Sequence, residues 1–574
     1  MTTAFTKIGM DKLQQMTPIT EGGEGYIYDY GGDILKIYKK NVDIASKEKK
    51  ITLLIQKSLP KEVVKPLQPV YDNKNKFIGY IMPKVTGEEI RVLTNKKYLK
   101  ANGIGTNDIL KMLVRIQEVI AQIHKAGVFI GDLNDQNILF NTKGEVFFID
   151  CDSWSIGTEK CEVVMDLYRD PLMKGNDFSE STDLYAESVL IWKTITRIHP
   201  HGGTMNPDID IMERMRRGIS VIDNPAVKIP RTIKSWKNLS PMLIESLKKV
   251  FENKSRSLGD ELADMYSNLK FCDKDQEYYY GKFNKCPLCE SSATVVTKPT
   301  SHGVMSGLTL YALLNDKEIK VVLSNKCYIK NNGMVADIYG HEHTCYQRGI
   351  FYNFLNMPNG GKILILTNED RIAFETDRQY YIDKKYRSSI YVDRNSIYFI
   401  SPSNTFMKMT VTANGNGIEK VAVCSYESYF AVDDCEYCIV NKYEGYVIVN
   451  CNGTNVELKY PHSIINYGIH RDSVSGKWLV VLQDGSGTFR TIVICGNNVE
   501  YDTDQIKYEC GLGNLCLSNS TIYIPIDGKI RGYSYQKQAF KDFECGIVTP
   551  DSRLIKSGAA FTIVNDENIY KLGK

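Results

Sequence analysis

The second half of the chain is built from short apolar runs that recur at a nearly constant spacing. Six such runs begin at residues 362, 396, 446, 478, 522 and 561, at intervals of 34, 50, 32, 44 and 39 residues. Each is rich in Ile, Val, Tyr or Phe and ends near Asn, Asp or Gly, as strands that end in turns do. An interval of about 40 residues is typical of β-propeller blades. With the earlier run LTLYALL, the pattern predicts an all-β domain over 300–574, a β-propeller of about six or seven blades. A β-sandwich is the alternative because no WD or kelch signature is present.

The part of the chain before residue 290 has a different pattern, in which strand-like runs give way to helical ones. The clearest helix is predicted over 106–127, where Ile109, Leu113 and Ile116 recur at spacings of three and four and share one face. Further helices are predicted over 181–198 and 240–253. Residues 25–40 fit a hairpin that turns at two glycines. A mixed α+β region therefore precedes the all-β region.

Length and composition set the limits of these predictions. A chain of 574 residues suggests about three domains. Hydrophobic residues make up 43% and charged residues 24%, and the net charge of +3 gives no signal for nucleic acid or a membrane surface. The N-terminal residues lack a secretory pattern, and no run approaches the roughly 18 apolar residues of a membrane span. A cytoplasmic location, in which the 15 cysteines stay reduced, is expected.

Residue types suited to nucleotide binding occur near the N-terminus. Gly22, Gly23 and Gly25 lie between two strand-like segments, and a backbone without Cβ atoms can approach a polyphosphate closely. Lys36 follows on the next strand, and Glu48 lies in the predicted helix after it, so the two are expected to form an ion pair that positions the lysine. A plain glycine turn and a solvated surface pair are the alternatives for these segments.

The segment GYIMPKVTG is predicted to be a strand that leads into a connection. Met82 is expected behind an adenine pocket, and Val85 is expected to supply a backbone amide donor. An edge strand ended by Pro83 is the alternative.

The stretch IGDLNDQNILFNTKGEVFFIDCDSW carries an ordered set of polar residues. Asp132 and Asn137 are five residues apart, and Asp150 follows 13 residues later, after an apolar run. These residues can supply a proton acceptor, an amide oxygen and a carboxylate for a metal ion. Phosphoryl transfer depends on such positioning and charge neutralisation.

This ordered set resembles the signature of the protein kinases and, more narrowly, bacterial serine/threonine-type kinases whose catalytic loop reads GDLN and whose metal motif reads DxDS. The resemblance covers about residues 10–270. It implies a bilobal α+β protein-kinase-like domain over 1–270, with an N-lobe of about 10–85 and a C-lobe of about 86–270, that uses ATP and Mg²⁺ or Mn²⁺. It implies nucleotide-binding roles for Gly22, Gly23, Gly25, Lys36, Glu48, Met82 and Val85. It implies catalytic roles for Asp132, Lys36 and Asn134, and metal-binding roles for Asn137 and Asp150.

The resemblance also implies a structural role for Asp183, which is expected to brace the catalytic loop from a core helix. Departures from the family pattern occur at Ile130, Gly131, Asn134, Cys151, Asp152 and Leu172. Gly131 stands where the family has an arginine that reads an activation-loop phosphate, and Asn134 stands where many members have lysine. Leu172 stands where a glutamate usually pairs with a later arginine, here Arg256. Asp152 is left without an assigned catalytic role.

Cysteines cluster over 271–295, between the two predicted domains. Cys286 and Cys289 have the two-residue separation of a zinc knuckle, and Cys272 precedes them by 14 residues. Glu277 is the nearest substitute for a fourth ligand. A structural zinc site and a set of reduced thiols without metal both remain open. The pair in CEYC (435–438) has the same spacing but lies in a predicted strand and is expected to be structural.

The sequence thus predicts an ATP- and Mg²⁺-dependent protein kinase that acts on Ser or Thr of a protein substrate. The C-terminal β domain is expected to recruit a partner or sense a ligand. Two alternatives remain open. A pseudokinase scaffold would bind nucleotide without transfer, and a small-molecule phosphotransferase would act on a metabolite.

Overall fold

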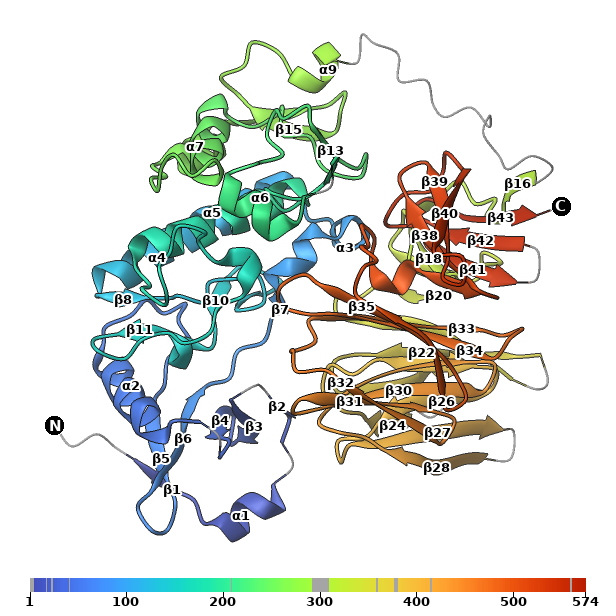
Figure 1. The fold of residues 1–574 in the computed structure, drawn as a ribbon, viewed down its shortest axis with the longest axis horizontal. Coiled ribbons are helices and arrows are strands. Elements are labelled where there is room, and N and C mark those ends of the chain that lie inside the picture. The colour runs from blue at the N-terminus through green and yellow to red at the C-terminus, as the bar shows by residue number, and fades with distance from the viewer. Residues whose placement is uncertain are drawn as a thin grey trace. The chain divides into compact units, whose positions relative to one another are not determined.

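The computed structural model of the protein (Figure 1) describes residues 5–573 apart from 17, 22–23, 41, 208, 292–308, 358–359, 376–379, 413–414 and 558–559. These residues divide into two compact units, one drawn from Met1–Met16 and Gly22–Lys298 and the other from Thr17–Glu21 and Pro299–Lys574. Within the described ranges, none of the helices combines the length and apolar character that a bilayer crossing requires.

The first unit begins with a sheet in which its strands lie in the order β1-β5-β6-β4-β3. Gly31 and Gly32 have φ angles of 64° and 97°, which glycine adopts without strain, and they turn β3 back into β4. The predicted hairpin is therefore confirmed. Strand β4, which carries Lys36, lies between β3 and β6. The strands are β1 (Thr6–Lys7), β3 (Gly25–Tyr30), β4 (Asp33–Tyr38), β5 (Gln68–Tyr71) and β6 (Phe77–Pro83).

Helices form the core of the rest of the first unit. Helix α4 buries the apolar face that its spacing predicts, including Ile109, Leu113 and Ile116, and packs against α5 and α8. The three predicted helices are confirmed as α4, α5 and α7. The α-helices before residue 270 are α1 (Met10–Gln15), α2 (Ile44–Gln56), α3 (Lys96–Asn102), α4 (Thr106–Lys125), α5 (Glu180–Thr196), α6 (Ile211–Arg217), α7 (Pro241–Phe251) and α8 (Glu261–Ser267). The 3-10 turns there are η1 (Ile90–Thr94), η2 (Cys151–Ser153) and η3 (Asp166–Tyr168).

Short strand pairs place the polar loops of the first unit. Ile138 on β9 (Ile138–Phe140) pairs with Phe148 on β10 (Val146–Phe148), so the residue before β9 and the residues after β10 meet at one end of the ladder. That pairing brings Asn137 and Asp150 to the same place. The other short strands are β7 (Glu88–Glu89), β8 (Val128–Phe129), β11 (Ser155–Ile156), β12 (Thr204–Met205) and β13 (Val227–Lys228). A hairpin of β14 (Leu269–Cys272) and β15 (Glu277–Tyr280), followed by α9 (Pro287–Ser291), ends the described part of this unit.

The described residues of the second unit form seven antiparallel sheets of four strands each. Six contain strands consecutive in the chain. They are β17–β20 (Ile319–Val322, Cys327–Lys330, Met334–Asp337, Glu342–Cys345), β21–β24 (Phe351–Asn356, Lys362–Thr367, Arg371–Glu375, Tyr380–Asp383) and β25–β28 (Ile390–Asp393, Ser396–Ile400, Thr405–Thr412, Gly415–Val423), then β29–β32 (Glu427–Asp433, Glu436–Tyr443, Tyr446–Cys451, Thr454–Lys459), β33–β36 (Asn466–Asp472, Lys477–Gln483, Phe489–Cys495, Asn498–Thr503) and β37–β40 (Cys516–Ser518, Thr521–Ile526, Lys529–Ser534, Ala539–Glu544). The seventh joins β16 (Thr309–Ala312) to β41 (Arg553–Ser557), β42 (Ala560–Val564) and β43 (Ile569–Gly573). A 3-10 turn, η4 (Leu512–Asn514), precedes β37.

Buried hydrophobic clusters join each of these sheets to the next along the chain. Val440 on β30 and Val480 on β34, for example, belong to one cluster shared by two successive sheets. The last sheet is joined to the first in the same way, since Val564 on β42 clusters with Val322 on β17 and Tyr328 on β18. Sheets that bury side chains on both faces need apolar residues at nearly every position of their central strands. That need accounts for the continuous apolar runs in the sequence.

The uneven spacing of the six runs has a simple origin. Each sheet contains three or four strands that follow one another in the chain. Five of the runs are the second of these strands, whereas the run at Tyr446 is the third, β31. The run LTLYALL includes β16, which completes the last sheet and does not begin one. The first complete sheet, β17–β20, is one that the run pattern missed.

Candidate active site

Lys36 lies on β4 and is held by two aspartates from the segment after β10. Its Nζ donates to Oδ1 and Oδ2 of Asp152 at 2.9 and 2.8 Å, and lies 3.3 Å from Oδ1 of Asp150. The residue is only 6% exposed. Burial lowers the pKa of Lys36, but the two facing carboxylates outweigh burial and raise it above its usual value. Lys36 therefore keeps its positive charge inside the protein.

Asp152 is fully buried and is the main counter-ion of Lys36. Its carboxylate also accepts hydrogen bonds from the hydroxyls of Tyr38 at 2.8 Å and Tyr80 at 2.9 Å. Burial by itself raises the pKa of this carboxyl, but the charges of Lys36 and Lys47, with hydrogen bonds from Lys36 and Tyr38, hold it below its ordinary value. Burial and the charge of Asp152 raise the pKa of both tyrosines. Asp152, which had no assigned role, thus stays ionised and anchors the lysine.

The expected ion pair between Lys36 and Glu48 is not formed. Glu48 accepts a hydrogen bond from the hydroxyl of Tyr71 at 2.9 Å, on the flank of α2. The buried face of α2 is made by Lys47, Lys50, Ile51 and Leu54, a helical spacing that leaves position 48 about 100° away from position 47. Lys47 therefore points inward, where its Nζ donates to Glu24 at 2.5 Å and to the backbone oxygen of Asp152 at 3.2 Å. The sequence prediction chose the wrong residue of the helix because it fixed no phase for α2.

The predicted glycine loop is only partly described. Gly22 and Gly23 lie outside the described residues, whereas Gly25 begins β3 and pairs with Tyr38. A Cβ atom at Gly25 would lie 2.6 Å from the carbonyl oxygen of Ile37, so the close approach of these two strands requires glycine there. A phosphate-binding role for the loop remains a prediction.

The two residues assigned to the adenine pocket lie at the end of β6. Met82 is paired with Ile34 of β4 and is partly buried against the core of the first unit. Val85 lies three residues further on, in the connection to β7, and is also partly buried. Their nucleotide-binding roles remain predictions.

The loop between β8 and β9 holds Asp132 in a fixed orientation. Oδ1 of Asp132 accepts from the amide nitrogen of Met165 at 2.9 Å and from Nδ2 of Asn134 at 3.1 Å, and Oδ2 accepts from Nδ2 of Asn137 at 3.0 Å. Oδ1 of Asn134 in turn accepts from the backbone amides of Gln136 and Asn137. The side chain of Asn134 therefore accepts from backbone amides of the loop through its oxygen and donates to Asp132 through its nitrogen.

The environment of Asp132 raises the pKa of its carboxyl above that of an ordinary aspartate. Burial, opposed by the three hydrogen bonds and assisted by the charge of Asp150, raises the pKa of this carboxyl to about 6. A carboxylate with such a pKa is a stronger base than an ordinary aspartate, and yet is mostly ionised at pH 7. The geometry therefore presents Asp132 as a proton acceptor.

Asp150 and Asn137 lie on adjoining segments, and each carries a side-chain oxygen donor. The amide nitrogen of Ile149 donates to the carbonyl oxygen of Asn137 at 3.0 Å, which joins the two segments. Asp150 has a left-handed φ of 57°, and its side chain is 51% exposed. The Nδ2 atom of Asn137 is engaged on Asp132, so its amide oxygen is the atom suited to a cation. A carboxylate and an amide oxygen are hard ligands, and the donor set fits Mg²⁺.

Asp183 on α5 braces the loop between β8 and β9, the one that holds Asp132, as expected. It is fully buried, and its carboxylate accepts from the backbone amides of Ile130 at 2.7 Å and Gly131 at 2.8 Å. Gly131 has a φ of 73°, and a Cβ there would lie 2.7 Å from Cβ of Cys161. Arginine, the residue of the family at this position, would therefore not fit without a local rearrangement.

Glu187, one turn after Asp183 on α5, is buried with one carboxylate oxygen lacking a hydrogen-bond partner among the described residues. Burial, and then the charge of Asp183, raises the pKa of Glu187 to about 8, from 4.5. The folded protein thus keeps a proton that the unfolded chain releases above pH 4.5. The stability contributed by this group is complete below pH 4.5, falls as pH rises, and is lost above pH 8.

Glu187→Gln removes this titration. Its free energy of unfolding relative to the wild type is expected to rise by about 2–4 kcal/mol between pH 4.5 and pH 8, measured by urea unfolding across that range. Glu180→Gln, on the exposed first turn of the same helix, makes the same chemical change at an exposed position and is the matched control. A pH-independent difference for Glu187→Gln would contradict the prediction.

Arg256 has a buried partner, Asp170, that the sequence analysis did not predict. Its Nε and Nη2 donate to the two carboxylate oxygens of Asp170 at 2.7 and 2.6 Å, and its guanidinium lies 5.0 Å from the ring centre of Tyr185. Leu172, where the family has glutamate, is exposed. The ion pair is therefore present, but its acid comes from two residues earlier in the chain.

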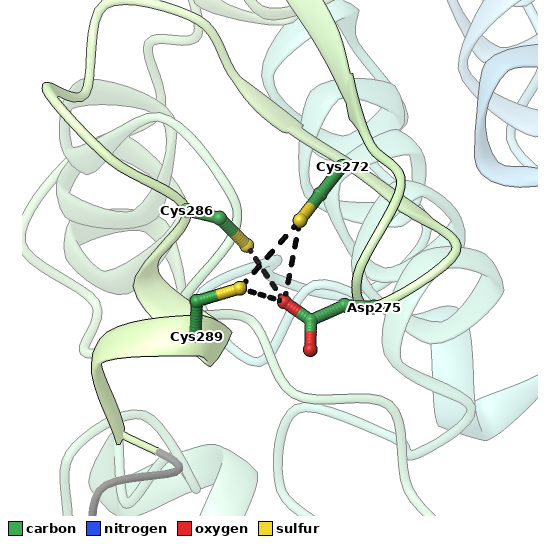
Figure 2. Close-up of side chains that lie close together, drawn as sticks. All are labelled: Cys272, Asp275, Cys286 and Cys289. Atoms are coloured by element: carbon green, nitrogen blue, oxygen red, sulfur yellow. Dashed lines mark hydrogen bonds between the residues drawn. The ribbon is translucent and has the colours of Figure 1, made fainter.

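The three predicted zinc cysteines converge, together with an aspartate that was not predicted (Figure 2). Cys272, Asp275, Cys286 and Cys289 place one ligand atom each within 4.8 Å of all the others. Glu277, the expected fourth ligand, is engaged elsewhere, since its carboxylate lies 2.8 Å from Nζ of Lys234 and accepts from the hydroxyl of Thr106 at 2.5 Å. One sequence signal pointed to Asp275, because Cys272 and Asp275 have the same separation as Cys286 and Cys289.

Comparison with known proteins supports a protein-kinase-like class for this chain. No protein-family model matches it. A stretch of 204 residues is 25% identical to "Protein kinase YegI" of Escherichia coli strain K12, covering 32% of this chain and 31% of that protein, and 24% identical to its counterpart in E. coli O157:H7. The chain thus spans about a third of the length of the curated relatives that it matches.

Among solved structures, the Cydia pomonella granulovirus kinase PK-1 aligns with 44% of this chain and 95% of its own. The sequence identity is 15% and the TM-score is 0.34.

Proposed function

We propose that the protein is an ATP- and Mg²⁺-dependent protein kinase that transfers the γ-phosphoryl group of ATP to Ser or Thr hydroxyls. One observation carries the proposal. Lys36 contacts Asp150 at 3.3 Å, Asn137 donates to Asp132 at 3.0 Å, and the amide of Ile149, next to Asp150, donates to the carbonyl oxygen of Asn137 at 3.0 Å. The similarity to protein kinase YegI supports the reaction class. The division into a catalytic domain (1–270), a cysteine knuckle (271–295) and a β domain (300–574) belongs to the same proposal.

Nucleotide binding is assigned to the sheet of the first unit. The ammonium of Lys36, which Asp152 holds in position, would contact the α- and β-phosphates of ATP. Backbone amides of the loop at Gly22, Gly23 and Gly25 would cover the phosphates, while Met82 and Val85 would border the adenine. Asn137 and Asp150 would hold Mg²⁺ or Mn²⁺, and such an ion neutralises negative charge on the phosphates.

Asp132 acts as the proton acceptor of the transfer. As the substrate hydroxyl oxygen forms its bond to the γ-phosphorus, the bond from that phosphorus to the bridging β–γ oxygen breaks. The hydroxyl proton passes to a carboxylate oxygen of Asp132, and ADP leaves with the electron pair of the broken bond. The hydrogen bonds from Met165, Asn134 and Asn137 support this role, because they fix the carboxylate before the substrate arrives.

The C-terminal unit is proposed to be a seven-bladed β-propeller that recruits a protein partner or senses a ligand. Seven four-stranded sheets, each clustered with the next, support this architecture. The pairing of β16 with β43 supports closure, because strands from the two ends of the described range 309–573 then complete one blade.

The proposal is tested by incubating the purified full chain with γ-labelled ATP and Mg²⁺, alone and with generic protein acceptors. Label on Ser or Thr is the expected result. Nucleotide binding without transfer would instead favour a pseudokinase scaffold, and transfer only to small metabolites would favour a small-molecule phosphotransferase. Either outcome would overturn the proposal.

A further inference from the structure

The hairpin of β14 and β15 and the short helix α9 bring together four side chains outside the active site. Figure 2 shows the sulfur atoms of Cys272, Cys286 and Cys289 and one oxygen of Asp275 pointing toward a common centre. Oδ2 of Asp275 lies 3.5 Å from the sulfur of Cys272, 3.2 Å from that of Cys286 and 2.8 Å from that of Cys289. The sulfurs of Cys272 and Cys289 are 3.6 Å apart.

Two of these four separations match those around a tetrahedral zinc ion. With zinc–sulfur bonds of about 2.3 Å and zinc–oxygen bonds of about 2.0–2.2 Å, neighbouring ligand atoms lie about 3.4–3.8 Å apart. The distances between Cys272 and Cys289 and between Cys272 and Asp275 fall in that range. The distances from Asp275 to Cys286 and Cys289, 3.2 and 2.8 Å, would have to lengthen on metal binding. We propose that Cys272, Asp275, Cys286 and Cys289 form a closed structural site for one Zn²⁺, with Asp275 as the fourth ligand.

The chemistry of the donors selects the metal. Three thiolates are soft ligands, which favour Zn²⁺ over the Mg²⁺ that suits the oxygen donors at Asn137 and Asp150. A disulfide explains the cluster less well, because the 3.6 Å between the sulfurs of Cys272 and Cys289 far exceeds a bond length of about 2.05 Å. A disulfide would also leave the third cysteine and the convergent carboxylate without a role.

The site would fasten the end of the first unit. The hairpin is already attached to the helical part, since the backbone amide of Tyr280 donates to the carbonyl oxygen of Asn238 at 2.9 Å and Lys234 pairs with Glu277. Helix α9 has only five residues, too few to be stable by propensity alone. A metal that joins Cys286 and Cys289 to Cys272 and Asp275 would attach α9 to the anchored hairpin.

The test measures metal in the full chain, purified without added zinc or chelator. About one zinc per chain is expected by mass spectrometry, and Co²⁺ exchanged into the site should give a thiolate-to-cobalt charge-transfer band. Cys289→Ser should lose both signals. Asp275→Asn should release zinc at a chelator concentration at least about tenfold lower than the wild type, because metal binding and local folding are coupled. Cys435→Ser, in the other pair of the same spacing, is the matched control and should keep zinc and spectrum.

Each contrary result has a definite meaning. Absence of both bound metal and a cobalt band would overturn the site. Iron in place of zinc would overturn the choice of metal. Unchanged zinc release in Asp275→Asn, with zinc lost from Cys289→Ser, would overturn the assignment of Asp275. These measurements do not depend on phosphoryl transfer, so the site and the proposed kinase activity can fail separately.

Discussion

Asp132→Asn is expected to transfer phosphoryl groups about 10²–10⁴ times more slowly than the wild type. Asparagine has nearly the same shape and can still accept the hydrogen bond from the amide of Met165. It cannot take up the proton of a substrate hydroxyl. Nucleotide binding should persist, because Lys36 and its partner Asp152 are unchanged. Single-turnover transfer from labelled ATP and equilibrium nucleotide binding measure the two properties separately.

Glu145→Gln is the control for Asp132→Asn. It removes one acid from the exposed turn between β9 and β10 in the same unit, away from the loop of Asp132. Its transfer rate should match that of the wild type. If Asp132→Asn also stays within about threefold of the wild type, the carboxylate is not the proton acceptor, because general-base catalysis contributes far more than that.

Features that depend on local pattern could be predicted from the sequence. The apolar face of α4 follows from a spacing of three and four, and the turn at Gly31 and Gly32 follows from the need for positive φ. The approach of Asn137 to Asp150 is also nearly local. The two short strands between them pair Ile138 with Phe148, and the turn that joins them leaves little freedom in register.

Features that depend on helix phase or on distant packing could not be predicted. Glu48 was chosen as the partner of Lys36 because it is the acid in the middle of α2, but the buried face of that helix passes through Lys47. The partner that the structure gives, Asp152, lies 116 residues from Lys36. The spacing of residues close together in the sequence does not predict such a contact. The residues adjacent in sequence also do not show whether an aspartate is buried or exposed.

Two other missed residues are substitutes from nearby positions. Asp170 pairs with Arg256 in place of an acid at position 172, and Asp275 lies at the cysteine cluster in place of Glu277. Both substitutes lie two residues from the expected position. In each case a turn decides which side chain points inward, since Asp170 caps a turn with the amide of Leu172 and Asp275 lies in the turn between β14 and β15. The need for an acid near each position could be predicted, whereas the acid that fills it depended on backbone geometry.

The contacts of Asp152 show that Lys36 is positioned by a different residue from the one expected. In the family pattern, a glutamate on the helix holds the lysine. Here the carboxylate that holds Lys36 is supplied by the segment that also supplies Asp150. Helix α2 contributes a cation, Lys47, which contacts the backbone of Asp152 and the carboxylate of Glu24 in the glycine loop. Movement of α2 would therefore act on Lys36 only indirectly, through Asp152.

Asp152→Asn is accordingly expected to lower the free energy of unfolding by about 3–5 kcal/mol, because it leaves the buried Lys36 and Lys47 without their shared negative partner. Transfer should fall about 10²-fold, because a small misplacement of Lys36 misaligns the phosphates. Urea unfolding and the dependence of the transfer rate on ATP concentration measure these effects. Tyr80→Phe, which keeps the carboxylate and removes one hydrogen bond to it, should lose only about 1 kcal/mol and supplies a folded comparison.

Glu48→Gln tests whether Lys36 is held by Asp152, as in the structure, or by Glu48, as the family resemblance implies. Because Glu48 contacts Tyr71 and not Lys36, the variant should keep its ATP dependence and lose at most about 1 kcal/mol of stability. If Glu48→Gln instead raises the ATP requirement strongly while Asp152→Asn does not, then Lys36 changes partners during the reaction. Asp152 would then hold the lysine only in the state described here, and α2 would have to rotate by about one residue, or 100°, to bring Glu48 inward.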